Sequence, residues 1–221
     1  MSLNRNGTEN KFGKMRAKQR ELILSCAFKL FISECFTKVS MKDIAKKSRL
    51  SRQTLYKYYP TIDDIIFEIE GGIMARGLAA IKSQIGDPNP TNGRQTILRM
   101  LKTVFDFGIY HSEETYFVTL FDLYSKTHSS DDRLENQLMK DIQENHIGMD
   151  YMNIGMKDGS IRTDIDAKLV SVLLFNEAVA LTLRFSVIGG VPFSLDKSIT
   201  MDKLVQQFLD AVDHDLAPQG K

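Results

Sequence analysis

The stretch SMKDIAKKSRLSRQTLYKYY, residues 40–59, is the part of the sequence that decides the fold. Ser40 precedes a short run with helical spacing, and Asp43 follows three positions later, as in a capping box. Ser51 is a good N-cap for a second short helix, and residues 48–50 form the turn between the two. Two short helices joined by a brief turn have the spacing of a helix-turn-helix motif.

The second of these helices has two faces of different character. Leu55 and Tyr59 lie four residues apart on one face, which predicts that both are buried. The opposite face carries four polar residues: Arg52, Gln53, Tyr56 and Lys57. Arginine can bind guanine and glutamine can bind adenine through paired hydrogen bonds, while lysine and tyrosine reach phosphates. This face therefore predicts contact with double-stranded DNA in the major groove, and the alternative is an ordinary solvated surface.

The residues that we expect to contact DNA come from both short helices and their caps. They are Ser40, Lys42, Ser51, Arg52, Gln53, Thr54, Tyr56, Lys57 and Tyr58. Within this set, Arg52 and Gln53 are the candidates for contacts with bases. Lys42 belongs instead to a basic patch that faces solvent or phosphates.

Four groups of residues carry a resemblance to a known family. They are Ala27, Phe28, Leu30 and Phe31; Ser40, Asp43, Ile44 and Ala45; Leu50, Ser51, Thr54, Leu55, Tyr56, Tyr58 and Tyr59; and Asp63, Asp64 and Ile65. Together they make the block from about residue 20 to residue 65 resemble the DNA-binding domain of the Tet repressor (TetR/AcrR) family. The resemblance implies an all-α fold and a homodimeric repressor that a small effector releases from a palindromic operator.

The sequence also departs from the family's pattern. The family often has glycine where Cys35, Arg49 and Gln53 stand, and Arg49 in the turn reduces the freedom of the backbone there. The family commonly has lysine where this chain has Ile62. One phosphate contact is therefore expected to be missing, with Thr61 as a weaker substitute.

The charge distribution agrees with a polyanionic partner. The whole chain has a net charge of only +1, but residues 1–60 hold 14 Lys and Arg against 4 Asp and Glu, which is a net charge of +10. Residues 61–221 hold 15 against 24, a net charge of −9. The alternative to a DNA-binding regulator is a helical ligand- or protein-binding module whose basic N-terminal part binds RNA or an acidic partner.

Other classes of protein find little support in the sequence. The apolar runs are shorter than the roughly 18 residues that a membrane span needs, and residues 1–13 show no apolar segment of a secretory signal. The two cysteines form no redox motif, so we expect a protein of the reducing cytoplasm without membrane association. The four histidines have no metal-ligand spacing, and no nucleophile elbow or phosphate-binding loop occurs. We therefore expect neither catalysis nor a metal nor a cofactor.

The domain organisation follows from helical periodicity and from the prolines. We expect a disordered tail over residues 1–13, a DNA-binding domain over 14–65, and an effector-binding and dimerisation domain over 66–221. The first helix is expected from about Lys14 to Cys35. A long helical segment after Thr61 joins the two domains, with a possible weak point at Gly71 and Gly72.

The helix expected near residues 165–188 is apolar on nearly all sides, so it needs cover on all sides. Together with the amphipathic last helix, it predicts a dimer interface of four helices, two from each chain; a central helix of a monomer is the alternative. The predicted interface residues are Leu173, Val179, Leu183, Leu204, Phe208 and Val212. Glu177 and Arg184, seven residues apart, share a face and could pair within or across the interface or be solvated.

An effector site can be predicted only from composition. Aromatic and methionine side chains suit adaptable apolar pockets, and a few polar groups within them fix the orientation of a ligand. The candidates are Phe105, Phe121, Tyr124, His146, Met149 and Asn176. The alternative is that these residues belong to the ordinary core.

Overall fold

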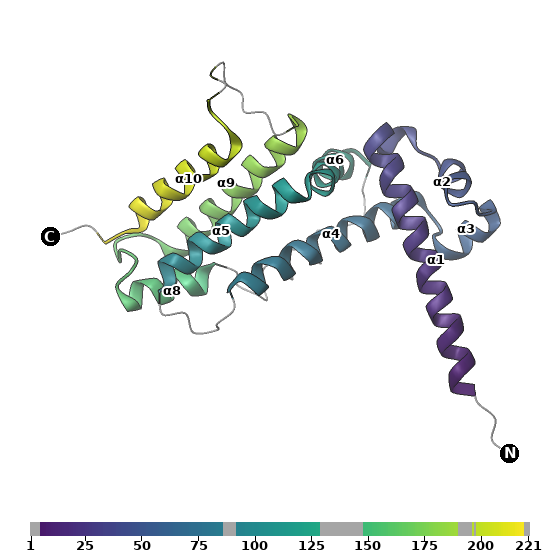
Figure 1. Cartoon of the computed structure of the whole chain (residues 1–221), viewed down its shortest axis with the longest axis horizontal. Helices are drawn as coiled ribbons and strands as arrows, with labels where there is room; N and C mark the ends of the chain where they lie inside the picture. The colour runs from purple at the N-terminus through teal and green to yellow at the C-terminus, as the bar shows by residue number, and fades with distance from the viewer. Residues whose placement is uncertain (1–4, 86–91, 129–147, 190–195, 197, 219–221) are drawn as a thin grey trace. The chain divides into compact units, whose positions relative to one another are not determined.

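The computed structural model describes residues 5–85, 92–128, 148–189, 196 and 198–218, and all regular structure in these ranges is helical (Figure 1). The helices are α1 (Arg5–Glu34), α2 (Met41–Lys47), α3 (Arg52–Tyr58), α4 (Ile62–Ile85), α5 (Gly93–Tyr110), α6 (Ser112–His128), α8 (Met149–Asp158), α9 (Ala167–Val187) and α10 (Met201–Leu216), with a short 3-10 helix at Phe36–Lys38. The prediction of an all-α fold is confirmed.

The first helix is longer than the sequence indicates. It begins at Arg5, nine residues before the expected start at Lys14, so most of the predicted tail continues the helix. The apolar stripe that marks α1 in the sequence begins only near Ile23, which is fully buried. The sequence before this stripe has no apolar periodicity, and therefore periodicity could not locate the start of the helix.

The chain divides into two compact units. The first comprises Met1–Gly72 together with Leu120–His128, and the second comprises Ile73–Thr119 together with Ser129–Lys221. The sequence predicts a domain boundary after Ile65. In the structure the first unit extends along α4 to Gly72 and also includes the end of α6. The helix α4 continues through Gly71 and Gly72 without a break.

In the first unit, α2 packs against α1 and α3 around a small apolar core. Phe31 of α1, Ile44 of α2 and Leu55 of α3 are completely buried, and Ile65 at the start of α4 joins them. Short helices are marginal in isolation, so α2 and α3 depend on this packing for their stability. The core thus holds α3 by one face only.

The end of α6 is attached to the first unit by aromatic and polar contacts. The Tyr124 hydroxyl donates a hydrogen bond to the Asp63 carboxylate at 2.7 Å, and the Tyr124 ring meets Phe36 edge to face at 5.4 Å. One turn away, Phe67 and Phe121 form a similar contact at 5.9 Å between ring centroids. These contacts explain why residues 120–128 belong to the first unit.

In the second unit, α5 packs against α8, α9 and α10. A close approach of backbones fixes the start of α5: a Cβ on Gly93 would lie 2.2 Å from the backbone nitrogen of Gly155. The Gly93 N–H also donates a hydrogen bond to the Asp158 carboxylate at 2.8 Å, which caps the helix. In the core, Phe105 meets Phe208 edge to face at 5.4 Å.

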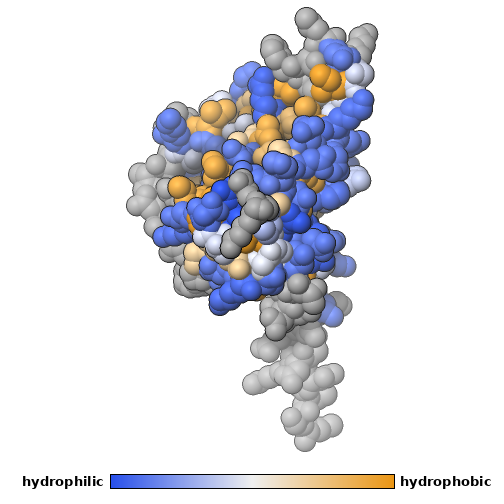
Figure 2. Space-filling view, turned by 90° about the vertical axis from the view of Figure 1, so that its left-hand side faces the viewer, coloured by the Kyte–Doolittle hydropathy of each residue, from blue (hydrophilic) through white to orange (hydrophobic). Residues whose placement is uncertain are grey.

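The helix α9 is buried on one face only. Leu174, Ala178 and Phe185 lie in the core of the second unit. On the opposite face Leu169, Val172, Leu173 and Val187 are each about half exposed or more. Hydrophobic residues also lie at the surface between hydrophilic ones on the side of the molecule drawn in Figure 2.

Among the described residues, α9 alone has the length and apolar composition of a helix that could cross a membrane. The central helix of a packed helical unit has the same composition, and one side of α9 packs in this way.

Candidate nucleic-acid interface

A complete capping box starts α2. The Ser40 hydroxyl accepts a hydrogen bond from the Asp43 N–H at 3.4 Å, and the Asp43 carboxylate accepts one from the Ser40 N–H at 3.0 Å. The hydrogen bonds from Ser40 lower the pKa of Asp43 below its ordinary value. The carboxylate therefore stays ionised at the positive end of the helix dipole, where a negative charge is stabilising.

A Schellman motif ends α2 and sets the direction of the turn. The Leu50 N–H donates to the Ala45 carbonyl at 2.9 Å, and the Arg49 N–H donates to the Lys46 carbonyl at 3.2 Å. Arg49 itself has φ 56°, in the left-handed region that glycine adopts most easily. The turn thus has the geometry that glycine would give, at a conformational cost of roughly 1 kcal/mol for an L-residue.

The departures from the family's glycines coincide with strained backbone at two positions. Cys35, before the short 3-10 helix, has φ 66°, and Arg49 has φ 56°. In the described part of the chain these are the two residues other than glycine with positive φ. Gln53, at the third position where the family often has glycine, lies inside α3.

The cap of α3 uses two side chains. The Ser51 hydroxyl accepts a hydrogen bond from the Thr54 N–H at 3.0 Å and lies 2.8 Å from the Thr54 hydroxyl. The capping hydrogen bonds of Ser40, Ser51 and Thr54 therefore stabilise the first turns of the two short helices. Ser40 and Ser51 are also exposed to solvent.

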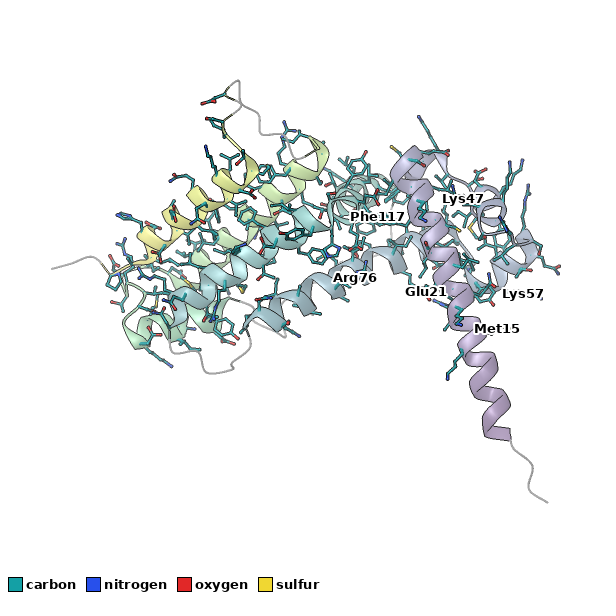
Figure 3. The ribbon with its side chains drawn as sticks, viewed as in Figure 1. Met15, Glu21, Lys47, Lys57, Arg76 and Phe117 are labelled. Carbon is teal, nitrogen blue, oxygen red and sulfur yellow. The ribbon has the colours of Figure 1, made fainter. Side chains whose placement is uncertain are left out.

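The two faces of α3 differ as the sequence predicts. Leu55 is 0% exposed and Tyr59 is 2% exposed, so the inner face of α3 is buried. On the outer side Tyr56 is 51% exposed. The remaining outer residues, Arg52, Gln53 and Lys57, are also exposed. The structure therefore brings the four predicted groups together on one accessible surface, and Figure 3 shows Lys57 on this helix.

The first helix contributes positive charge beside the end of α3. The Arg16 guanidinium lies 5.9 Å from the centre of the Tyr58 ring, and that of Arg20 lies 4.9 Å from the centre of the Tyr59 ring. Arg20 also forms an ion pair with Glu68 of α4. Sequence reasoning did not connect Arg16 with Tyr58, because no local spacing reveals a contact between separate helices.

Further cations lie on the same motif. Lys42, Lys46 and Lys47 of α2 are exposed, as is Arg49 in the turn. Lys47 is labelled in Figure 3 on α2. Together with Arg52 and Lys57 they make this side of the first unit strongly basic, which suits a phosphate backbone.

The structure places the predicted effector residues at separate positions. Phe121 and Tyr124 belong to the first unit, whereas Phe105, Met149 and Asn176 belong to the second. Phe105 is completely buried against Phe208, and Asn176 is exposed with its amide donating to the Val172 carbonyl at 2.8 Å. His146 lies outside the described residues. A common pocket for this set remains a prediction.

The predicted dimer residues are exposed to different extents. Leu173 is 52% exposed and Leu204 is 37% exposed, while Val179, Leu183 and Phe208 are partly buried. Val212 is 5% exposed and lies within the core of its own unit, so it is not available at the surface. Val212 belongs to the periodic apolar stripe of α10, on the side of the helix that packs against the core of its own unit.

The described residues contain no group of three or more His, Cys, Asp or Glu side chains that could hold a metal ion. In the second unit, Glu114 forms an ion pair with Arg76 at 3.1 Å. Its carboxylate also lies 3.9 Å from His111. This cluster ties the start of α6 to α4.

Comparison with known proteins agrees with the helix-turn-helix geometry. Residues 23–69 match the family model described as bacterial regulatory proteins of the tetR family. No curated protein matches the sequence significantly.

Solved structures resemble the chain over most of its length. A ketosteroid transcriptional regulator of Mycobacterium tuberculosis is 18% identical with a TM-score of 0.66, covering 90% of this chain and 95% of that one. The MbdR regulator of Azoarcus sp. CIB is 16% identical with a TM-score of 0.67, covering 90% and 98%. A tetR-family regulatory protein from Rhodococcus is 13% identical with a TM-score of 0.69, covering 92% and 99%.

Identities at this level establish a common fold, and the family match covers the segment that contains α2, α3 and the start of α4. The helix-turn-helix segment therefore matches the tetR family of bacterial regulatory proteins, and the whole chain shares the fold of solved structures described as tetR-family regulators.

Proposed function

We propose that this regulator is a homodimeric repressor that binds a near-palindromic operator through α3 and leaves it when a small effector binds. The observation that carries the proposal is that α3 has one buried apolar face and one exposed polar face. Arg52, Gln53 and Lys57 are exposed, whereas Leu55 and Tyr59 are buried beneath them. A helix fixed by its inner face can present its outer face to the major groove without rearrangement.

Each exposed side chain has a role that follows from its chemistry. Arg52 and Gln53 can form paired hydrogen bonds with base edges, so they supply sequence selectivity. Lys57 and the cations of α2 bind phosphates, which supplies affinity without selectivity. Tyr56 presents a hydroxyl and a ring at the same surface.

The homodimer is supported by the exposed apolar side of α9. Leu169, Val172, Leu173 and Val187 form a row of half-exposed apolar side chains on one face of a single helix. Patches of this kind mark interaction sites more often than ordinary surface. Two-fold symmetry would place two copies of α3 in successive major grooves, about 34–36 Å apart.

Release by an effector requires two states of the dimer. A ligand in the acidic second unit can lower the affinity for DNA only if it binds the released state more tightly than the DNA-bound state. The single helix α4 begins in the first unit and ends in the second, which supports it as the connecting element. Such a regulator acts where the DNA is, in the cytoplasm.

Electrophoretic shifts with genomic fragments in moderate salt test the proposal. We expect selective shifts, and Arg52→Ala should lose about 1–3 kcal/mol of selectivity at one base position of each half-site. Lys57→Ala should weaken binding to all sequences and flatten the salt dependence. Lys157→Ala, an exposed lysine of α8, is the matched control and should change neither. Uniform weak shifts, or stronger binding to RNA, would contradict operator recognition.

A further inference from the structure

The exposed side of α9 carries two opposite charges placed symmetrically about a small residue. Glu177 and Arg184 are both exposed on this side, and Ala180 lies between them, also exposed. Seven residues are almost two turns of helix, so the two charged side chains share a face and are about 10 Å apart along the axis. That separation is too long for them to pair with each other.

Both charges are exposed to solvent in the single chain. The structure gives no ion pair to Glu177 or to Arg184 within the described part of the chain, although the apolar residues Leu173 and Val187 flank them on the same face. Charged residues within an apolar strip weaken a non-specific contact unless a partner supplies the opposite charge. A partner that is complementary to this surface would carry an acidic and a basic group at matching positions.

A second copy of α9 supplies this pattern in one orientation only. If two copies cross near Ala180 in parallel, two-fold symmetry places the charged side chains of the two copies at opposite edges of the contact, so Glu177 and Arg184 cannot pair across it. If they cross in the antiparallel sense, each Glu177 lies at the level of the other copy's Arg184, because both are about 5 Å from the crossing point. The small side chain of Ala180 allows the two backbones to approach there.

We propose that α9 pairs with α9 of a second copy in the antiparallel sense about Ala180, with two reciprocal ion pairs between Glu177 and Arg184. This pairing rests on the homodimer proposed above and defines its register. The apolar residues supply most of the binding energy, and the ion pairs make the surface selective for its own copy. A different regulator with the same apolar strip but without these charges would leave two charged groups unpaired.

Charge reversal at each position tests the register. Sedimentation analysis of the full chain should show that Glu177→Lys and Arg184→Glu each raise the dimer dissociation constant by about tenfold or more, because two attractions become two repulsions. The double variant Glu177→Lys with Arg184→Glu should restore dimerisation to within about threefold of the original protein, since the charges match again. The weakening in the single variants should diminish in high salt.

Lys168→Glu is the matched control. It is an exposed charge reversal on the same helix, about 120° around the axis from Ala180, and it should leave the dissociation constant unchanged. Circular dichroism of every variant separates loss of folding from loss of pairing.

The outcomes separate the two proposals. A monomeric unmodified protein would overturn the homodimer itself. A dimer that the single reversals leave intact, or that the double variant fails to restore, would overturn the antiparallel register while the homodimer stands.

Discussion

Glu70 of α4 offers a prediction whose size follows from the structure. It is only 4% exposed and has no ion-pair partner among the described residues. Burial, with a further contribution from the negative charge of Asp122 on α6, raises the pKa of Glu70 from its ordinary 4.5 to about 7. The folded protein therefore holds a proton on Glu70 at pH values at which the unfolded chain has lost it.

The sign of the pH dependence follows from this difference. Because the folded state binds the extra proton, the contribution of Glu70 to stability is complete below pH 4.5 and is lost as the pH rises through about 7. The difference between the two pKa values corresponds to a loss of about 3 kcal/mol over the whole range. Roughly 2–3 kcal/mol of this should be lost between pH 5 and pH 8.5.

The substitution Glu70→Gln isolates this effect, because glutamine resembles the protonated carboxyl and cannot ionise. Urea unfolding at a series of pH values should show the original protein losing stability relative to the variant by the amount given above. Glu113→Gln, at an exposed carboxylate, is the control and should give a nearly constant difference. If the free energies of unfolding of the original protein and of Glu70→Gln change with pH in the same way, the reasoning is refuted.

Three further substitutions test the packing and the caps. Ser51→Ala removes the cap of α3 and should cost about 1 kcal/mol in urea unfolding and weaken DNA binding, while Ser51→Thr should largely retain both. Gly93→Ala would force a Cβ to within 2.2 Å of the Gly155 backbone nitrogen and should lower the free energy of unfolding by roughly 1–3 kcal/mol or more; an unchanged melting temperature would contradict this contact. Tyr124→Phe deletes the hydrogen bond to Asp63 and should cost roughly 1 kcal/mol. A loss no larger than that of an exposed surface variant would show that the bond contributes nothing.

Features that depend on residues close together in the chain could be predicted from the sequence. The capping box of Ser40 and Asp43 and the cap at Ser51 have the predicted hydrogen bonds. The two faces of α3 follow from a spacing of four residues, and the burial of Leu55 and Tyr59 confirms it. In each case the physical cause is local, so the local pattern was sufficient.

Features that depend on distant contacts could not be predicted. Nothing local in the sequence shows that Tyr124 bonds to Asp63 and so joins the end of α6 to the first unit. Composition alone grouped Phe105 with Asn176, although one is buried and the other exposed. Periodicity assigned Val212 to a dimer interface, whereas it lies in the core of its own unit. A helix face that packs in a core and one that packs against a second copy have the same apolar pattern, so periodicity cannot distinguish them.

The strained turn lies between these two cases. The sequence showed that Arg49 stands where related chains often have glycine, and the structure adds that the backbone there is left-handed, with φ 56°. The hydrogen bonds of the Schellman motif fix this conformation regardless of the side chain. The departure therefore leaves the turn geometry intact and adds a cation beside α3.

Methylation interference on an operator fragment tests the central claim most directly, because it asks which bases the exposed face of α3 contacts. If Arg52 binds guanine, methylation at N7 should block binding at one guanine in each of two half-sites, about 10–10.5 base pairs apart. The Arg52→Ala variant should lose this interference. Binding of the original protein that is insensitive to methylation at every guanine, or an identical pattern for the variant, would contradict the account.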